Sequence, residues 1–420
     1  MKVSIVKIGE PLPGEEIRVR RMTYYARALI AAGEEVEWWT SNWNHHKKKT
    51  RDTAELKALA ASEKIHLHFI RTPGYNQNVS IGRLAHHYIF AKKLIQELEN
   101  YPDPDILWVC FPTVPVAVNL IRWATRKQVK IIFDIRDLSP DIFLEHAPST
   151  FKPLINLCLE PTRQSIAKAF SSANGLVAVS QGYLDWGERL ALRYQRLPPF
   201  RAVLPLGHEM EDLSEKQVLT LKARLIQKGL KEKCCLKVVY AGGFGHSYDI
   251  LTVLEAAKLS AEQNINVQFL IAGGGAIQDE VTNAAQNCEN LLYLGWLDSD
   301  ELQVLLSLSD IGLMPYSDKA TQGFPNKIYE YLAHGLVLVS SLRGESQSFI
   351  KDHKLGFIYP PNSAKSLCGL VKNLVENQKI VEEISSNALS VYQKKFNSDR
   401  MASKMVEFTE SVFRNSFLGH

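Results

Sequence analysis

The sequence has no uninterrupted apolar run close to the length of a membrane-spanning helix, and its first residues, Met1 to Val6, are too short and interrupted for a signal peptide. Its six cysteines form no Cys-x-x-Cys pair and no Cys/His set with zinc-site spacing, which predicts reduced thiols in a cytoplasmic protein. The net charge of +4 is small and no nucleic-acid-binding motif occurs. We therefore expect a soluble cytoplasmic protein with no nucleic-acid partner.

The composition, 45% hydrophobic and 22% charged residues, is that of an ordinary globular protein. A chain of 420 residues is expected to divide into about two domains. Apolar segments of strand length alternate with helical segments throughout, and this pattern predicts parallel sheets covered on both faces. Strands are expected at 2–8, 35–40, 66–70, 105–110, 130–134, 175–179, 236–241, 267–272, 291–294, 311–314, 336–341 and 356–359, with an extended piece at 202–205. Helices are expected at 15–32, 80–99, 114–127, 151–172, from about 182, at 214–228 and at 398–416.

The most informative stretch runs from residue 322 to residue 341. Pro325 suits the first turn of a helix, Gly335 suits its end, and the apolar residues that follow predict a buried strand. Lys327 falls in the first helical turn, where the helix dipole disfavours a cation unless an anion lies beside it. Glu330, on the same helix face, could accept two ribose hydroxyls. The stretch thus suggests a nucleotide site; the alternative is an exposed lysine–glutamate pair on a surface helix.

The run from Pro325 to Gly335, followed by an apolar strand, resembles the nucleotide-sugar site of family 4 glycosyltransferases, in the branch found in bacterial O-antigen and capsule assembly. The resemblance implies that Glu330 holds the donor ribose. Many members have a second glutamate eight residues earlier, where this chain has Gln322. An amide can bind sugar hydroxyls but supplies no negative charge.

The resemblance also implies the two-lobed GT-B architecture, with two Rossmann-like domains facing across a cleft. The N-terminal acceptor-side domain is expected to span residues 1–207, with the last helix, within 398–420, crossing back to it. The C-terminal donor-binding domain is expected to span 208–397.

Glycine-rich loops after the strands of the second domain are candidates for donor binding, because glycines let backbone N–H groups approach an anion. The family usually supplies an arginine and a lysine after the first of these loops, but neither lysine nor arginine occurs between Val238 and Ala257. Lys327 is therefore the first candidate for the diphosphate, and Arg343 and Lys319 are weaker ones. Trp296 either faces the base or lies in the core. The predicted donor-binding residues are Gly242, Gly243, Gly245, Gly273, Gly295, Trp296, Phe324, Pro325, Asn326, Lys327 and Glu330.

The acceptor side is assigned to two loops of the first domain. The loop after strand 2–8 contains Gly14 and Arg18, which border donor phosphate and acceptor in the family. Asp134, Arg136 and Asp137 follow a buried strand and are expected to face the cleft, because unpaired charges are costly to bury. The alternative for this cluster is an arginine–aspartate pair that only holds the loop.

Basic residues at 45–51, close to Trp38 and Trp39, suggest contact with anionic lipid headgroups, which would suit a polyprenyl-linked acceptor. A solvated loop is the alternative, and the two tryptophans stand in a predicted strand. If membrane contact occurs, the protein lies at the inner face of the membrane.

The sequence as a whole suggests a retaining glycosyltransferase that moves a sugar from a UDP- or GDP-sugar to a glycan or polyprenyl-linked acceptor in bacterial surface polysaccharide synthesis. Retention is implied by the resemblance alone. No Asp-x-Asp pair stands in a loop suited to a metal, so neither a metal nor another cofactor is expected. A sugar-nucleotide epimerase and a catalytically silent partner subunit are the alternatives. The predicted catalytic residues are Lys327, Glu330, Asp137 and Gln322.

Overall fold

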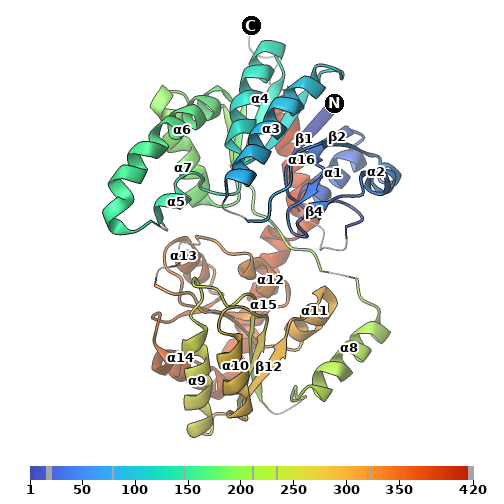
Figure 1. Cartoon of the computed structure of the whole chain (residues 1–420). Coiled ribbons are helices and arrows are strands. Elements are labelled where there is room, and N and C mark those ends of the chain that lie inside the picture. The colour runs from blue at the N-terminus through green and yellow to red at the C-terminus, as the bar shows by residue number, and fades with distance from the viewer. Residues whose placement is uncertain are drawn as a thin grey trace. The chain divides into compact units, whose positions relative to one another are not determined.

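The computed structural model describes residues 1–15, 21–77, 80–145, 147–210, 212–232, 235–318, 320 and 323–414. The chain divides into two compact units, Met1–Leu206 with the segment from Ser398, and Gly207–Asn397. The division between the two falls one residue before the boundary expected from the sequence. Figure 1 shows helices on both faces of the sheet in each unit.

The first unit is built on seven parallel strands in the order β5-β2-β1-β6-β7-β8-β9. They are β1 (Lys2–Val6), β2 (Glu35–Ser41), β5 (Ile65–Ile70), β6 (Ile106–Phe111), β7 (Lys130–Ile135), β8 (Gly175–Ala178) and β9 (Phe200–Val203). Its helices are α1 (Arg21–Ala31), α2 (Thr53–Ser62), α3 (Ile81–Leu98), α4 (Val114–Lys127), α5 (Ile142–Glu145), α6 (Lys152–Ser172), α7 (Gln181–Ala191) and α16 (Ser398–Arg414), with 3₁₀ turns at Ser149–Phe151 and Leu192–Tyr194.

Two apolar layers cover the faces of this sheet. One joins α3, α4, α6 and α7 to strand residues such as Trp39, and the other joins α1, α2 and α16 to strand residues such as Trp38. Successive strand residues point to opposite faces, so the two tryptophans fill opposite layers and are almost completely buried. They are core residues and are not available to a membrane surface.

Helix α16 is the segment that returns to the first unit, where it runs beside α1 (Figure 1). Three contacts fix it there. The Tyr25 hydroxyl lies 2.6 Å from the Thr409 hydroxyl, the Lys130 ammonium donates to the Val412 carbonyl at 2.6 Å, and the Phe408 ring packs against Trp108. The last helix therefore completes the apolar layer on one face of the sheet.

The second unit is built on six parallel strands in the order β12-β11-β10-β13-β14-β15. They are β10 (Leu236–Ala241), β11 (Val267–Ala272), β12 (Leu291–Gly295), β13 (Ile311–Met314), β14 (Val337–Ser340) and β15 (Gly356–Ile358). The helices are α8 (Glu215–Gln227), α9 (Ile250–Glu262), α10 (Gln278–Gln286), α11 (Ser299–Ser307), α12 (Lys327–Ala333), α13 (Glu345–Asp352), α14 (Ala364–Glu376) and α15 (Gln378–Lys395).

The predicted alternation of strands and helices is confirmed in both units, with most ends within two residues of their expected positions. The sequence prediction missed a small hairpin, β3 (Trp43–Asn44) with β4 (Lys49–Thr50), and helix α2. The hairpin strands are too short for a periodicity of two. Helix α2 buries only Leu56 and Ala60, so its apolar face gives a weak signal.

Candidate functional site

The second unit changes strand order between β10 and β13, its two central strands. From β10 the chain winds outward to β11 and β12, and it then returns to β13 and continues in the other direction. Loops at the carboxyl ends of such a pair diverge and leave a crevice, which is where doubly wound sheets bind ligands. In this unit, that position lies at Ala241, the last residue of β10, and Met314, the last residue of β13.

Lys327 reaches this position from the start of helix α12. Its ammonium donates a hydrogen bond to the Ala241 carbonyl, and lies 4.7 Å from the ring centre of Tyr240 and 5.6 Å from that of Tyr248. A cation is attracted to the face of an aromatic ring. The lysine is thus held over the end of β10 by one carbonyl and two tyrosine rings, and the interpretation of an exposed surface lysine is wrong.

Burial lowers the pKa of Lys327 to about 8, and the nearby Glu330 carboxylate acts in the opposite direction. The amine is still mostly protonated at neutral pH, but its charge is poorly solvated. A bound anion at this position would stabilise the ammonium charge in place of the water that burial removes. The electrostatics therefore favour a bound anion beside Lys327.

Gly242 and Gly273 allow the loops after β10 and β11 to pack directly on each other. A Cβ on Gly242 would collide with the Lys327 ammonium, and a Cβ on Gly273 would overlap the Gly242 carbonyl. Both residues have positive φ, 152° and 133°. The loops are joined by N–H donation from Gly242 to the Ala272 carbonyl at 2.9 Å, and the Tyr240 hydroxyl donates to the Gly243 carbonyl at 2.7 Å. These glycines shape the crevice beside Lys327.

A test of this packing is Gly273→Ala. We expect the free energy of unfolding to fall by about 2–4 kcal/mol, because the new methyl group overlaps a backbone carbonyl and the φ value is unfavourable for alanine. Gly245→Ala is the matched control, since no atom lies within 4 Å of the added Cβ, and it should change stability by less than about 1 kcal/mol. Urea denaturation of both variants measures the difference. Equal stabilities would show that the loops do not need this close approach.

The other predicted residues of α12 have different environments. Glu330 is partly exposed one turn after Lys327, and Asn326 is exposed at the cap position of the helix. Pro325 is buried. The Phe324 ring packs against those of Tyr329, Phe349 and Phe396 at centroid distances of 5.4, 5.0 and 6.2 Å. The aromatic contacts of Phe324 indicate that it positions the segment before α12.

Trp296 follows β12 with its side chain 80% exposed. The interpretation of Trp296 as a core residue is therefore wrong. Gly295 before it has φ 68°, and its carbonyl accepts the Gly273 N–H at 2.8 Å, which links the third loop to the first two. An exposed indole at the carboxyl edge of the sheet is a surface on which a planar ring could stack.

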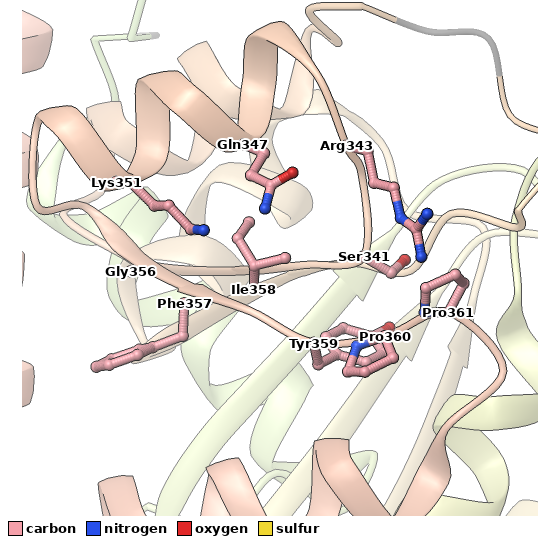
Figure 2. Close-up of a pocket in the computed structure, with 10 residues that line it drawn as sticks. All are labelled: Ser341, Arg343, Gln347, Lys351, Gly356, Phe357, Ile358, Tyr359, Pro360 and Pro361. Atoms are coloured by element: carbon pink, nitrogen blue, oxygen red, sulfur yellow. The ribbon is translucent and has the colours of Figure 1, made fainter.

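Arg343 lies in a separate hollow of about 580 Å³, at the edge of the sheet between α13 and β15. Figure 2 shows its guanidinium beside Ser341 and Pro361, while Gln347 and Lys351 project from α13 above Ile358. None of the residues that line the hollow is Lys327, Glu330 or a glycine of the three loops. Arg343 therefore lies in a different hollow from the Lys327 site.

In the first unit, Asp134 and Arg136 form a buried ion-pair network. Arg136 Nε donates to Asp134 Oδ2 at 3.0 Å, and Arg136 Nη1 donates to Glu10 Oε2 at 2.6 Å. Arg21 Nε lies 3.4 Å from the same Asp134 oxygen. Asp134 has no exposed surface, so an acceptor could reach it only by displacing two arginines. The network supports the loop-holding alternative for this pair and removes Asp134 from the acceptor-side set. Asp137, next along the loop, is partly exposed and stays a prediction.

The basic segment 45–51 is also not a uniform surface patch. Arg51 is buried: its Nε donates to Glu15 Oε1 at 3.0 Å, and its Nη2 donates to the Glu10 carbonyl at 2.9 Å. Arg51 therefore ties the hairpin to the loop after β1, in which Gly14 is exposed and packs on Leu59 of α2. The prediction of lipid contact through this segment is wrong for Arg51. Arg18, Lys319 and Gln322 lie outside the described residues.

Sequence reasoning missed three residues that shape these sites. Tyr240 and Tyr248 hold Lys327, and Glu10 pairs with Arg136. A usable signal is the absence of lysine and arginine between Val238 and Ala257, together with tyrosines at 240 and 248 on either side of the first glycine loop.

Comparison with known proteins finds similar sequences and similar structures. Residues 222–391 match the family model "Glycosyl transferases group 1". A segment of 167 residues is 23% identical to the amylovoran biosynthesis glycosyltransferase AmsK of Erwinia amylovora, covering 38% of this chain and 40% of that protein. The chain thus matches less than half the length of this curated relative. The resemblance to family 4 bacterial glycosyltransferases predicted from the sequence is confirmed.

Solved structures match over almost the whole chain. HepE of Anabaena in complex with UDP superposes with a TM-score of 0.67 at 15% identity, covering 98% of this chain and 100% of that one. WaaG, a glycosyltransferase involved in lipopolysaccharide biosynthesis, superposes with a TM-score of 0.62 at 14% identity, covering 96% of this chain and 98% of that one. The fold is GT-B, as predicted. Among the helices that the structure describes, none combines the length and apolarity that crossing a membrane requires.

Proposed function

We propose that this protein is a glycosyltransferase that moves a sugar from a nucleoside-diphosphate sugar to a glycan or lipid-linked acceptor in bacterial polysaccharide synthesis. The observation that carries the proposal is the position of Lys327, a half-buried cation at the switch point of a parallel sheet, with Glu330 one helical turn away. The match of residues 222–391 to group 1 glycosyltransferases and the amylovoran relative support it.

In the proposed mechanism, Lys327 neutralises the diphosphate that leaves the sugar. Charge on the leaving oxygens grows in the transition state, and a preorganised cation with little access to water stabilises it strongly. Glu330 accepts hydrogen bonds from the ribose hydroxyls, and Trp296 stacks on the base. We propose that transfer retains the anomeric configuration by front-face displacement, in which donor phosphate helps to take the acceptor proton. We also propose that neither a metal ion nor another cofactor takes part.

The donor is proposed to be a UDP- or GDP-sugar. The UDP alternative is supported by HepE, which was crystallised with UDP-glucose and with UDP. The acceptor is proposed to be a bacterial surface glycan such as O-antigen or capsule, or its polyprenyl-linked precursor. A cytoplasmic location, at the inner face of the membrane for a lipid-linked acceptor, goes with this proposal.

Nucleotide binding tests the donor site directly. Thermal unfolding of the whole protein with UDP, GDP and their sugars should show stabilisation by one base, about 2.7 kcal/mol at a ligand concentration one hundred times the Kd. Incubation of that donor with and without acceptor then separates transfer from epimerisation, because an epimerase changes the donor alone. Failure of every nucleotide to bind would contradict the proposal and leave a silent partner subunit.

The pKa of Lys327 predicts a pH dependence of donor binding. The diphosphate binds the protonated amine, so affinity should be highest below pH 8 and decrease as the pH rises through the pKa of about 8. The expected loss is about fivefold between pH 8 and pH 9. Calorimetric titration of the wild type and Lys327→Met across pH 7 to 9.5 measures it, and the ratio of the two affinities cancels ionisation of the base. A ratio independent of pH up to 9.5 would show that this amine does not contact the diphosphate.

A further inference from the structure

A second basic cluster lies in the first unit and has no role in the donor site. We call it the histidine–lysine cluster; it surrounds Tyr75 and draws residues from the β3–β4 hairpin and from helix α3. His45 Nδ1 lies 2.6 Å from the Tyr75 hydroxyl, and the Lys48 ammonium lies 4.8 Å above the Tyr75 ring centre. The His86 ring is 5.0 Å from the Tyr75 ring and 5.8 Å from the His87 ring. Its members are His45, Lys48, Tyr75, Arg83, His86 and His87.

Burial and neighbouring positive charges both oppose protonation of the histidines in the cluster. Burial, followed by the charges of Lys48 and Arg83, lowers the pKa of His45 to about 4. Burial, followed by Arg83 and the neighbouring histidines, lowers the pKa of His87 to about 3. Both imidazoles are therefore uncharged at neutral pH, and the positive charge of the cluster comes from Lys48 and Arg83. Burial and the charge of Arg83 lower the pKa of Lys48, and an anion beside the two cations would offset their mutual repulsion.

The cluster lies among the loops that follow three neighbouring strands of the sheet, β1, β2 and β5. The hairpin follows β2 and the Tyr75 loop follows β5, and these strands lie beside β1 on one side of the sheet. A Cβ on Gly9, in the loop after β1, would lie 3.3 Å from the His45 Cβ, so this loop runs against the cluster. The cluster therefore lies at the carboxyl edge of the sheet, the edge at which doubly wound domains bind ligands.

We propose that the histidine–lysine cluster binds a phosphoryl group of the acceptor substrate, the phosphate or diphosphate that links its glycan to a carrier. This inference rests on the proposed function, because only a glycosyltransferase needs an acceptor. A phosphoryl group has several oxygens that accept hydrogen bonds from different directions. This matches the Lys48 ammonium and the Arg83 guanidinium, which both act electrostatically on the His45 imidazole.

The test uses the whole protein and two soluble probes, inorganic pyrophosphate and farnesyl diphosphate, with farnesol as the uncharged counterpart. The double variant combines Lys48→Gln with Arg83→Gln. Its control is Lys92→Gln, at an exposed lysine further along α3, and Lys327→Met tests the donor site. Because Lys327 also binds a diphosphate, the comparison is made in the Lys327→Met background. There we expect both diphosphates to bind about tenfold more weakly when Lys48 and Arg83 are replaced, a ratio that corresponds to about 1.4 kcal/mol. Lys92→Gln should bind them as the wild type does, and farnesol should not distinguish the variants.

UDP and GDP titrations separate this inference from the donor site. The double variant should keep nucleotide binding, and Lys327→Met should bind nucleotides about tenfold more weakly while keeping diphosphate binding at the cluster. In the Lys327→Met background, equal binding of both diphosphates with and without the Lys48→Gln and Arg83→Gln changes would overturn the inference and leave the donor site intact. The inference would also be overturned if neither diphosphate binds while the wild type binds phosphatidylglycerol vesicles and the double variant does not, a result that would assign the cluster to a membrane surface. Thermal unfolding of the double variant checks its fold, which the removal of repelling charges should not weaken.

Discussion

Lys327→Met is expected to make the protein more stable and nearly inactive. We expect donor-dependent transfer to fall by about 1,000-fold, because the leaving diphosphate loses the cation that neutralises its developing charge. The free energy of unfolding at pH 7 should rise by about 1 kcal/mol, because a poorly solvated charge is replaced by an apolar side chain of similar length. Kinetic assays and urea denaturation of the same preparation measure both effects.

The stability gain has a defined pH dependence. The pKa of Lys327 lies at about 8 in the folded protein, below its ordinary value of 10.5. Below pH 8 the lysine is protonated in both the folded and the unfolded chain, so the full cost of holding the charge is present. Between pH 8 and 10.5 the unfolded chain binds more protons, wild-type stability rises, and the advantage of the variant shrinks.

Lys372→Met is the matched control for this variant. Lys372 is an exposed lysine of α14, so this substitution should alter neither activity nor stability by a measurable amount. A Lys327→Met protein with wild-type turnover would contradict the role of the lysine. A large loss of stability would instead assign Lys327 to the fold.

Glu330→Ala is expected to lower kcat/KM for the nucleotide-sugar donor by about 100-fold, equivalent to about 2.7 kcal/mol of transition-state stabilisation. The reason is the loss of two hydrogen bonds from the ribose hydroxyls to a carboxylate. The helix should persist, because Glu330 is partly exposed and its neighbours Ile328, Tyr329 and Tyr331 are buried. Steady-state kinetics and circular dichroism measure the two quantities.

A 2′-deoxy nucleotide makes this test specific for the ribose. If Glu330 binds the diol, the wild type should discriminate against 2′-deoxy-UDP or 2′-deoxy-GDP, and Glu330→Ala should not, since the interaction is already lost. Glu383→Ala, an exposed position of α15, provides the control for removing a carboxylate. If wild type and Glu330→Ala discriminate equally, Glu330 does not contact the ribose.

The predictions that succeeded were based on local patterns. Strand β10 at 236–241, strand β11 at 267–272 and helix α4 at 114–127 were predicted with their observed ends. Their apolar runs, and the glycine and proline residues around them, act over a few residues, so the signal is complete within the segment. The same is true of Lys327, whose place in the first turn of α12 follows from Pro325 and the spacing to Gly335.

The predictions that failed concerned the direction and partners of side chains. Trp38, Trp39 and Arg51 were grouped as a surface patch because they lie close together in sequence with other basic residues. Period-two alternation in β2 already places the two tryptophans on opposite faces, but only the helices packed on both faces bury both of them. Asp134 and Arg136 are paired with each other, and the arginine also reaches Glu10, 126 residues away in the chain.

The sequence by itself determined two doubly wound units, the helix that begins at Lys327 and the glycine loops at the strand ends. Each follows from the periodicity and turn preferences of neighbouring residues. Only the tertiary structure decided that the Lys327 ammonium meets the Ala241 carbonyl, 86 residues earlier, between the rings of Tyr240 and Tyr248. The physical reason is that parallel strands distant in sequence end at one edge of the sheet, so the charges, rings and carbonyls that meet there are set by strand order and not by local sequence.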